Sequence, residues 1–187
     1  MRRTPARREA QTLHGVFLDI LGLGVLITGE SGIGKSELAL ELLSRGHKLV
    51  ADDAPEFERS ADHQILGHAP ALLRNFLEVR GLGILDVRAM FGARAIRRKK
   101  PLELVIRLES PPAGGLPHRD RLSGSRSEQA VLGVAIPRIS LPVMPGHNLS
   151  VLVEAACRDH KLRRRGYSAA EAFAHRQAAS LDGEDKS

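Results

Sequence analysis

The stretch Gly29-Glu30-Ser31-Gly32-Ile33-Gly34-Lys35-Ser36 decides the fold of this chain. It satisfies the pattern G-x-x-x-x-G-K-[ST], whose backbone N–H groups cradle phosphates when the pattern lies between a strand and a helix. The glycines let the backbone curl around one phosphate, and the positive end of the following helix dipole adds to the same site. We expect Lys35 to reach the terminal phosphates and the Ser36 hydroxyl to ligate Mg²⁺. The whole stretch is therefore predicted to bind a nucleotide or pyrophosphate, the alternative being a Gly-rich turn without a ligand.

The residues on either side of this phosphate loop have the strand and helix patterns that the motif requires. Residues 15–28 (GVFLDILGLGVLIT) predict two strands joined by a turn at residues 22–24. Residues 36–45 carry leucines at helical spacing and are followed by Gly46, a typical helix stop, so they predict a helix. Further strands are expected at 47–51, 76–79, 102–108 and 150–154, and a mobile loop is expected at 110–127. A terminal helix is expected at 168–178, and its capping box consists of Ser168 and Glu171. The order of these elements predicts an α/β fold.

Length and composition indicate one ordinary soluble domain. The chain has 187 residues, of which 42% are apolar and 27% charged, so wholesale disorder is excluded. We expect a disordered leader at residues 1–12, a P-loop (Walker A) catalytic domain at 13–178 and a disordered tail at 179–187. No run approaches the roughly 18 apolar residues of a membrane span, and no secretory signal is present, which predicts a cytoplasmic location. The only cysteine, Cys157, excludes an intramolecular disulfide.

The balance of charge points to an anionic ligand or partner. Lys and Arg exceed Asp and Glu by 28 to 22, for a net charge of +6. Aromatic residues make up only 3% of the chain, which leaves few stacking platforms for unpaired bases, so a nucleic-acid partner is not expected. The basic segments 94–100 (RAIRRKK) and 161–165 remain open to two readings, a docking face for an acidic protein or RNA and a solvated charged face.

An acid or base facing the terminal phosphate is needed for a reaction, and Asp52 and Asp53 are the natural candidates. They follow the strand expected at 47–51, and functional groups gather at the carboxyl ends of strands in α/β sheets. Adjacent side chains of a strand point to opposite faces, so one aspartate is expected to face the phosphates unless the strand has already ended. An exposed turn or a helix cap is the alternative for this pair. On local evidence alone, His14 is more typical of a surface or packing residue.

The chain resembles the HPr kinase/phosphorylase family. These bacterial enzymes phosphorylate a serine of the phosphocarrier protein HPr and remove the phosphoryl group again by phosphorolysis. The resemblance runs from His14 to about Gly166 and rests on short matches in a conserved order along the chain. They are His14-Gly15, the phosphate loop GESGIGKSE, LVADD ending at Asp53, EVRGLGILDV at 78–87, Asp120-Arg121-Leu122, Leu141-Pro142-Val143 and Pro145-Gly146.

The resemblance implies a fold similar to the nucleotide-binding core of phosphoenolpyruvate carboxykinase, assembly as a hexamer, and use of ATP or pyrophosphate with Mg²⁺. By the same resemblance, Lys35 holds the β- and γ-phosphates, and Ser36 and Glu78 help to hold the metal. Asp53 is the general base toward the substrate serine and the general acid in the reverse direction. His14 and Arg121 complete the catalytic set.

Three departures from the family pattern are visible. The family's N-terminal domain has no counterpart in these residues, which fits either an excised catalytic domain or a naturally short relative, and different regulation is expected. The family's loop PV-R-PG-R-N reads here PVMPGHN, with Met144 and His147 in place of two arginines in a segment associated with dephosphorylation. Glu30 replaces the usual Asp of the phosphate loop, a change that we expect to be tolerated.

Together these observations predict a Mg²⁺-dependent serine kinase of an HPr-like phosphocarrier protein, with possible phosphorolytic reversal. A phosphate-loop kinase of another hydroxyl substrate is one alternative. A nucleotide-binding regulatory module without catalysis is another. A nucleic-acid-binding module rests on charge alone and predicts affinity that falls steeply with salt.

Overall fold

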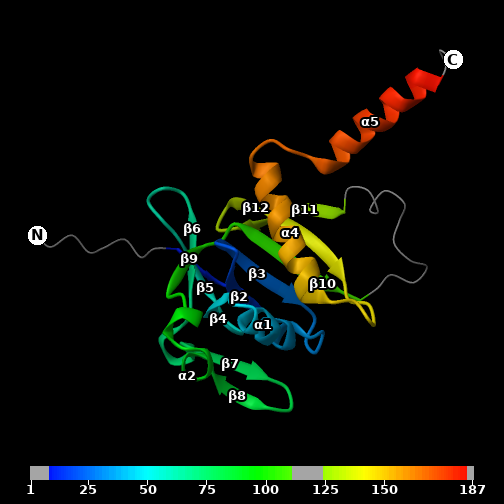
Figure 1. The fold of residues 1–187 in the computed structure, drawn as a ribbon. Coiled ribbons are helices and arrows are strands. Elements are labelled where there is room, and N and C mark those ends of the chain that lie inside the picture. Colours follow the sequence, from blue (N-terminus) through cyan, green and yellow to red (C-terminus); the bar gives the residue numbers. More distant parts are fainter. Residues whose placement is uncertain (1–8, 111–123, 185–187) are drawn as a thin grey trace, which may run out of the picture.

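A mixed six-stranded sheet carries the phosphate loop. The computed structural model describes residues 9–110 and 124–184, and the strands of this sheet lie in the order β11-β12-β10-β3-β2-β4 (Figure 1). The central strand β3 pairs in parallel with β10 and antiparallel with β2. The bounds are β2 (Val16–Ile20), β3 (Leu23–Gly29), β4 (Lys48–Ala51), β10 (Leu104–Glu109), β11 (Ser125–Val131) and β12 (Val134–Pro142).

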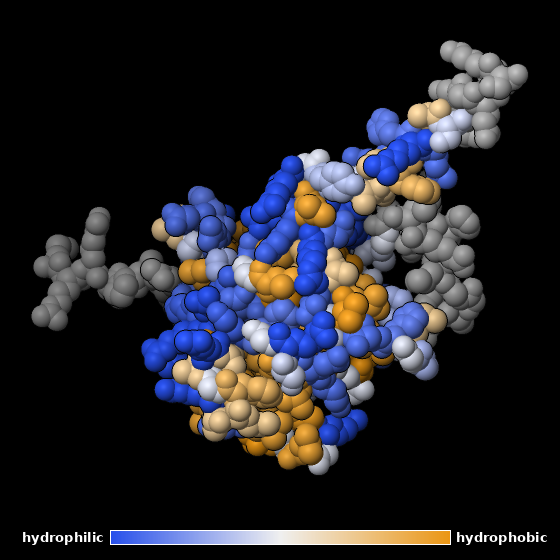
Figure 2. Space-filling view, viewed as in Figure 1, coloured by the Kyte–Doolittle hydropathy of each residue, from blue (hydrophilic) through white to orange (hydrophobic). Residues whose placement is uncertain are grey.

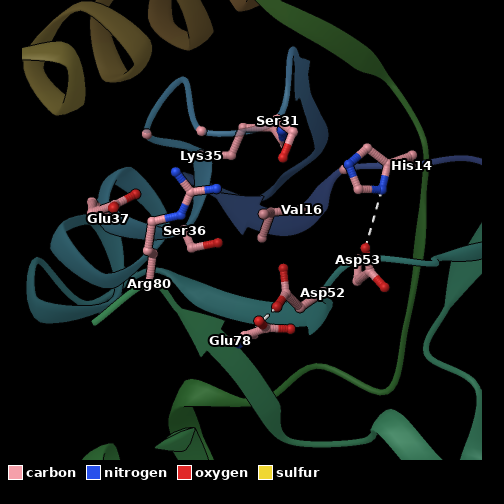
Figure 3. Close-up of a pocket in the computed structure, with 13 residues that line it drawn as sticks. His14, Val16, Ser31, Lys35, Ser36, Glu37, Asp52, Asp53, Glu78 and Arg80 are labelled. Carbon is pink, nitrogen blue, oxygen red and sulfur yellow. Dashed lines mark hydrogen bonds and ion pairs between the residues drawn. The ribbon is translucent and has the colours of Figure 1, made fainter. Parts of the chain in front are cut away.

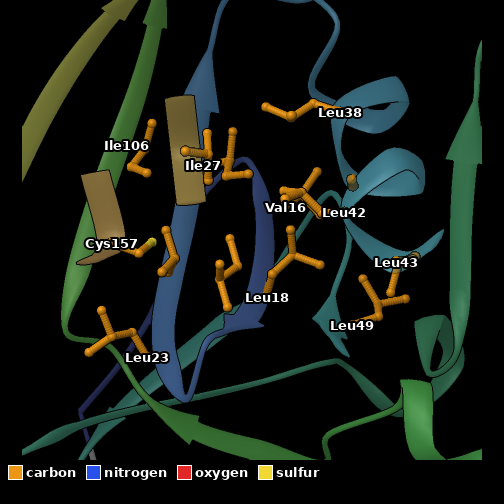
Figure 4. Packing of buried hydrophobic residues seen from close by; sticks show 14 of the residues in the cluster. Val16, Leu18, Leu23, Ile27, Leu38, Leu42, Leu43, Leu49, Ile106 and Cys157 are labelled. Carbon is orange, nitrogen blue, oxygen red and sulfur yellow. The ribbon is translucent and has the colours of Figure 1, made fainter. Parts of the chain in front are cut away.

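Helices α1 (Lys35–Ser44) and α4 (Leu149–Arg164) cover one face of this sheet, where the main core lies. Leu38 and Leu42 of α1 pack with Val16 and Ile27 of the sheet, and Cys157 of α4 joins them (Figure 4). Cys157 is fully buried, and this burial raises the pKa of its thiol to about 12. The strands therefore present to the helices a continuous apolar surface, as the Val-, Ile- and Leu-rich sequence predicts.

The opposite face packs against a smaller antiparallel sheet of order β1-β5-β6-β9. Phe17 of β2 points to this side, and its ring meets that of Phe57 edge to face with 5.2 Å between centroids. Because successive side chains of β2 point to opposite faces of the sheet, this one strand contributes residues to both hydrophobic cores. The bounds are β1 (Ala10–Thr12), β5 (Glu56–Arg59), β6 (Ile65–His68) and β9 (Lys99–Pro101).

A hairpin and short helices complete the fold beside α1. The hairpin consists of β7 (Phe76–Val79) and β8 (Gly83–Asp86), and α2 (Val87–Phe91) follows it. Single-turn helices η1 (Ala71–Leu73) and η2 (Ala93–Ala95) flank this unit. The terminal helix α5 (Ala169–Glu184) projects away from the rest of the molecule (Figure 1). Among the helices of the described ranges, none has the length and apolar character needed to cross a membrane.

An ionic cluster ties α1 to α4. Glu154 of α4 accepts hydrogen bonds from Arg45 at 2.8 Å and Arg158 at 3.4 Å, and its Oε1 lies 2.9 Å from Nε2 of His47. The Glu154 side chain is buried, and these partners, Arg45 first, lower its pKa to about 2. The cluster fixes the end of α1 against the middle of α4.

The elements expected around the phosphate loop are confirmed. The hairpin at 15–28 forms β2 and β3, although its turn lies at Leu21-Gly22, earlier than expected, with φ of 51° and 82°. The expected helix at 36–45 is α1, and the strands expected at 47–51 and 76–79 are β4 and β7. The strand expected at 102–108 is β10, shifted toward the C-terminus. The terminal helix begins as expected, since the Glu171 N–H donates to Ser168 Oγ at 3.4 Å.

Other expectations need correction. The strand expected at 150–154 is wrong: these residues lie in α4, whose first turn is capped by Asn148 Oδ1 accepting from the Val151 N–H. Residues 125–127 of the expected loop belong to β11, and residues 111–123 lie outside the described ranges. The expected disordered ends are also too long, because Ala10–Thr12 pair with β5 and α5 continues to Glu184.

Candidate active site

The phosphate loop joins the end of β3 to the start of α1, as the motif requires. Gly34 precedes the helix at a φ of 99°, a left-handed conformation that glycine adopts without strain. A Cβ on Gly29 would lie 2.7 Å from the carbonyl oxygen of Leu108, so this close approach to β10 also requires glycine. The Lys35 ammonium donates to the carbonyl oxygens of Gly29 and Glu30, both at 2.9 Å. The lysine therefore lies along the loop whose phosphates it is predicted to hold.

A cavity of about 190 Å³ opens in front of this loop (Figure 3). Its walls come from the start of β2, the phosphate loop, the end of β4 and the end of β7. The cavity thus gathers segments that are far apart in the sequence. The lining residues are His14, Gly15, Val16, Ser31, Gly32, Gly34, Lys35, Ser36, Glu37, Asp52, Asp53, Glu78 and Arg80.

Most residues predicted for the site line this cavity, and three others belong to the phosphate loop beside it. Gly29 and Glu30 line a neighbouring cavity, which His14 also borders, and supply the carbonyl groups that hold Lys35. Ile33 packs against the main core and thereby anchors the loop. Arg121 lies outside the described residues.

Asp53 and His14 form an ion pair in the wall of the cavity. Asp53 Oδ1 lies 3.1 Å from His14 Nδ1, and each side chain is 63% exposed. The Gly15 N–H also donates to the Asp53 carbonyl oxygen at 3.1 Å, which ties the start of β2 to the end of β4. Asp53 has a φ of 64°, a conformation that aspartate tolerates better than most residues. This local geometry turns the carboxylate of Asp53 toward the open side of the cavity.

Asp52 also faces the cavity but is buried. Its Oδ2 accepts a hydrogen bond of 2.8 Å from the Glu78 N–H. Burial raises the pKa of the Asp52 carboxyl, and the N–H groups of Glu78 and Asp53 partly oppose this shift. Because β4 ends at Ala51, the alternation of a strand no longer separates the two aspartates, which is the exception that the sequence analysis left open.

Sequence reasoning missed Arg80 and Glu37. A Cβ built on Gly32 would lie 3.1 Å from Arg80 Nη1, so the guanidinium lies against the phosphate loop. Figure 3 shows Arg80 directed toward this loop. The sequence signal that could have identified Arg80 is its spacing of two residues from Glu78. This spacing places both side chains on the same face at the end of β7. Glu37 lies in the first turn of α1.

The segment that departs from the family pattern lies beside the phosphate loop. Val143 and His147 line a groove together with Ile33 and Gly34. Met144 is exposed, and the Val143 N–H donates to the Glu109 carbonyl oxygen at 2.8 Å. The two missing arginines therefore belong to a segment that borders the site.

The donor set of the cavity fits Mg²⁺ bound together with phosphates. Among the described residues, no three His, Cys, Asp or Glu side chains form a ready-made metal cluster. Mg²⁺, however, usually keeps several waters and takes only one or two carboxylates plus substrate phosphates. Ser36 and Glu78 offer oxygen atoms only, which suits such a hard cation.

Comparisons with known proteins agree with this geometry. The protein-family model described as the HPr serine kinase C-terminal domain matches residues 7–177 of this chain. Proteins called HPr kinase/phosphorylase from Stenotrophomonas maltophilia (strain K279a) and Xanthomonas campestris pv. campestris (strain B100) are each 54% identical over 91% of this chain and 54% of their own length. The chain thus spans about half the length of the curated relatives it matches.

A solved structure gives the same result for the fold. The structure of the Hpr(Ser) kinase/phosphatase from Coxiella burnetii superposes with a TM-score of 0.79 at 39% identity, covering 87% of this chain and 98% of that one. The α/β phosphate-loop kinase fold expected from the sequence is therefore confirmed. The chain belongs to the family of HPr serine kinase C-terminal domains.

Proposed function

We propose that this chain transfers a phosphoryl group from ATP, or from pyrophosphate, to a serine hydroxyl of an HPr-like phosphocarrier protein. The observation that carries this proposal is the single cavity in which the phosphate loop faces the Asp53–His14 pair. A donor of phosphate and a base for an incoming hydroxyl thereby border the same cavity. The names of the relatives support HPr as the protein substrate.

The chain's own residues divide the work of transfer. Lys35 and the loop N–H groups hold the phosphates, and Ser36 and Glu78 would hold Mg²⁺, which neutralises phosphate charge when bound. Asp53 accepts the proton of the serine hydroxyl as the new bond forms, and His14 orients the carboxylate. Arg80 supplies a further positive charge at the loop, and Arg121 keeps the role that the family resemblance implies.

The exposure of the Asp53–His14 pair favours a large substrate. Both side chains are reachable from the protein surface, and the cavity is too small to enclose a nucleotide together with a second organic substrate. A serine on the surface of a docked protein can approach such a base directly.

In the reverse direction, inorganic phosphate attacks the phosphorus of phosphoserine, pyrophosphate forms, and Asp53 returns a proton to the serine oxygen. Microscopic reversibility lets the same carboxyl group serve both directions. Hexameric assembly and a cytoplasmic location stay predictions of the sequence analysis.

The decisive experiment incubates the protein with Mg²⁺, ATP and purified HPr, and locates phosphate on HPr by mass spectrometry. Transfer to one serine, absent when that serine is replaced by alanine, is the expected result. ATP binding without transfer to HPr would instead favour the nucleotide-binding module. Transfer to a small hydroxyl compound but not to HPr would favour the other kinase class.

A further inference from the structure

The β7–β8 hairpin brings Glu78 to the candidate active site but belongs to neither of the two larger sheets. Its inner side is held by apolar packing, because Leu77 and Val79 are buried in the main core. Its outer side is open: Leu82 and Ile84 are exposed, and Figure 2 shows a hydrophobic area over β7 and β8. The position of the hairpin relative to the phosphate loop therefore depends on contacts along its inner side.

One polar contact joins this hairpin to the six-stranded sheet. The Glu78 N–H donates to Asp52 Oδ2 at 2.8 Å, and Asp52 is the residue that follows β4 (Figure 3). Within residues 9–110 and 124–184, no other hydrogen bond links β7 or β8 to the elements of that sheet. Asp52 is only 7% exposed, so water has little access to compete for this bond.

The Glu78 carboxylate itself has no such anchor. Because Leu77 and Val79 point into the core, the alternation of a strand directs the Glu78 side chain to the other face, where it lines the cavity. In the described part of the chain, this carboxylate accepts no hydrogen bond and forms no ion pair. Its direction is therefore set by the backbone at Glu78, and Asp52 holds that backbone.

We propose that Asp52 is a positioning residue for the metal: its carboxylate fixes the backbone of Glu78 and thereby places the Glu78 carboxylate where Mg²⁺ binds with the phosphates. The proposal rests on the role proposed above for Glu78 in holding Mg²⁺. Groups that orient a metal ligand without touching the metal commonly change metal affinity by about 10–100-fold. Accepting an N–H requires an oxygen atom but no negative charge. Asp52 differs in this from Asp53, whose proposed role as a base requires a carboxylate.

The first measurement needs no phosphocarrier protein. The affinity of a fluorescent ADP analogue is measured in EDTA and at saturating Mg²⁺, and the ratio is the gain in affinity that the metal supplies. Asp52→Ala removes the acceptor, whereas Asp52→Asn keeps an oxygen that can accept from the Glu78 N–H. The matched control is Glu103→Ala, because Glu103 Oε2 also accepts a backbone N–H, that of Gly24 at 3.1 Å, but lies outside the cavity.

For the unmodified protein, we expect Mg²⁺ to tighten binding of the ADP analogue about tenfold or more, since one charge-assisted contact changes affinity by about that factor. Asp52→Ala should lose most of this gain, while its affinity in EDTA stays within about twofold of the unmodified protein. Asp52→Asn and Glu103→Ala should keep the gain. Circular dichroism checks the fold, and Asp52→Leu, which fills the space without an acceptor, replaces Asp52→Ala if that variant does not fold.

A double-mutant cycle tests whether Asp52 acts through Glu78. Glu78→Gln should lose the gain from Mg²⁺, and adding Asp52→Ala to Glu78→Gln should lower it by less than about twofold further. Transfer to HPr gives a second readout, in which Asp52→Ala should need about tenfold more Mg²⁺ while kcat at saturating Mg²⁺ stays within about threefold. If no protein transfers phosphate to HPr, the proposed function fails, but the nucleotide measurements still decide the role of Asp52.

Several results would overturn the proposal. A full gain from Mg²⁺ in Asp52→Ala is one, and the absence of any gain in the unmodified protein is another. An equal loss in Asp52→Asn would mean that the charge of Asp52 acts directly on the metal or the phosphates. An equal loss in Glu103→Ala would indicate a general loss of stability, and additive losses in the double variant would show that Asp52 does not act through Glu78.

Discussion

Glu154 and Asp53 are both carboxylates with a histidine beside them, yet their surroundings are opposite. Glu154 is buried between α1 and α4 with Arg45, His47 and Arg158 around it, and its pKa falls to about 2. Asp53 lies at the mouth of the cavity, 63% exposed, with His14 as its one ionic partner among the described residues. The Glu154 carboxylate is fully engaged in ionic contacts within the fold, whereas the Asp53 carboxylate keeps lone pairs that can accept a hydrogen bond or a proton.

This difference separates residues that hold the structure from residues that can react. A charge satisfied on all sides contributes to stability and has nothing left for a ligand. A charge with one partner and access to solvent can accept a proton from an incoming group. The comparison therefore predicts that changes at the cavity alter activity and changes at the α1–α4 contact alter stability.

The largest effect is expected from Lys35→Ala. Loss of the ammonium removes the positive charge that lies along the phosphate loop, so phosphate transfer to HPr should fall by about a thousandfold or more. The fold should persist, because no apolar core surface is lost. The measurements are the rate of HPr phosphorylation and thermal unfolding by circular dichroism. Transfer at the unmodified rate would refute the assignment of the loop.

Asp53→Asn should come next, with a loss of about a hundredfold or more in both directions. Asparagine also tolerates the left-handed backbone at this position, so the substitution tests the carboxylate rather than the fold. Asp52→Asn is the matched control and should cost far less, because an amide oxygen can still accept from the Glu78 N–H. Rates of phosphorylation and of phosphorolysis check both variants. A larger loss from Asp52→Asn would make Asp52 the essential base.

A gain is expected from Met144→Arg combined with His147→Arg. Phosphorolysis brings a free phosphate beside phosphoserine, and two cations in the segment that borders the phosphate loop would reduce their repulsion. We expect this direction to accelerate about tenfold or more, with the kinase rate within about threefold. The measurement is pyrophosphate release from serine-phosphorylated HPr. Met90→Arg with His175→Arg adds the same charge at exposed sites elsewhere, and an equal gain there would show that general charge is responsible.

The smallest effect on activity should come from Glu154→Gln, because this substitution is expected to lower the stability of the fold and not the rate of transfer. Losing the ionic contacts should cost about 1–3 kcal/mol, a fall of roughly 3–10 °C in Tm, while transfer rates stay unchanged. Glu128→Gln, at an exposed position of β11, should change neither quantity. An unchanged Tm for Glu154→Gln would mean that the cluster does not stabilise the fold.

The same variant has a defined pH dependence. The pKa of Glu154 is about 2 in the folded protein, below the ordinary value of 4.5, so the folded state favours the ionised form. The stability from this group is therefore fully present above about pH 4.5 and is lost as the pH falls toward 2. The difference in Tm between the unmodified protein and Glu154→Gln should shrink over that interval. A difference that persists at pH 2 would contradict the ionic origin of the effect.

Local patterns predicted the part of the fold that builds the phosphate loop. The strand, glycine loop and helix from β3 to α1 are contiguous in sequence, so apolar spacing and glycine positions were enough. The strand expected at 150–154 failed because valines at 151 and 153 suit a strand, while the Asn148 cap and packing on α1 select a helix. Strand β11 was missed because its residues are mostly polar and exposed, and its partner β12 provides the pairing.

The candidate site likewise contains residues that a local motif predicts and residues that only the tertiary structure brings together. The phosphate-binding residues follow from the motif, whereas the contact between His14 and Asp53 joins residues that no local pattern connects. Their roles came from the family resemblance. Arg80 was missed because its approach to Gly32 depends on how the β7–β8 hairpin packs beside α1, which is a tertiary property.

The openness of the Asp53–His14 pair has a consequence for water. A base exposed at the mouth of a cavity is accessible to solvent as well as to a serine hydroxyl, so water competes as an acceptor of the phosphoryl group. Many kinases exclude it by closing a loop or domain over the bound nucleotide. If the proposed function holds, a docked phosphocarrier would itself cover the pair. The protein substrate would then act as the lid of the enzyme, and its arrival would both deliver the acceptor and remove the competitor.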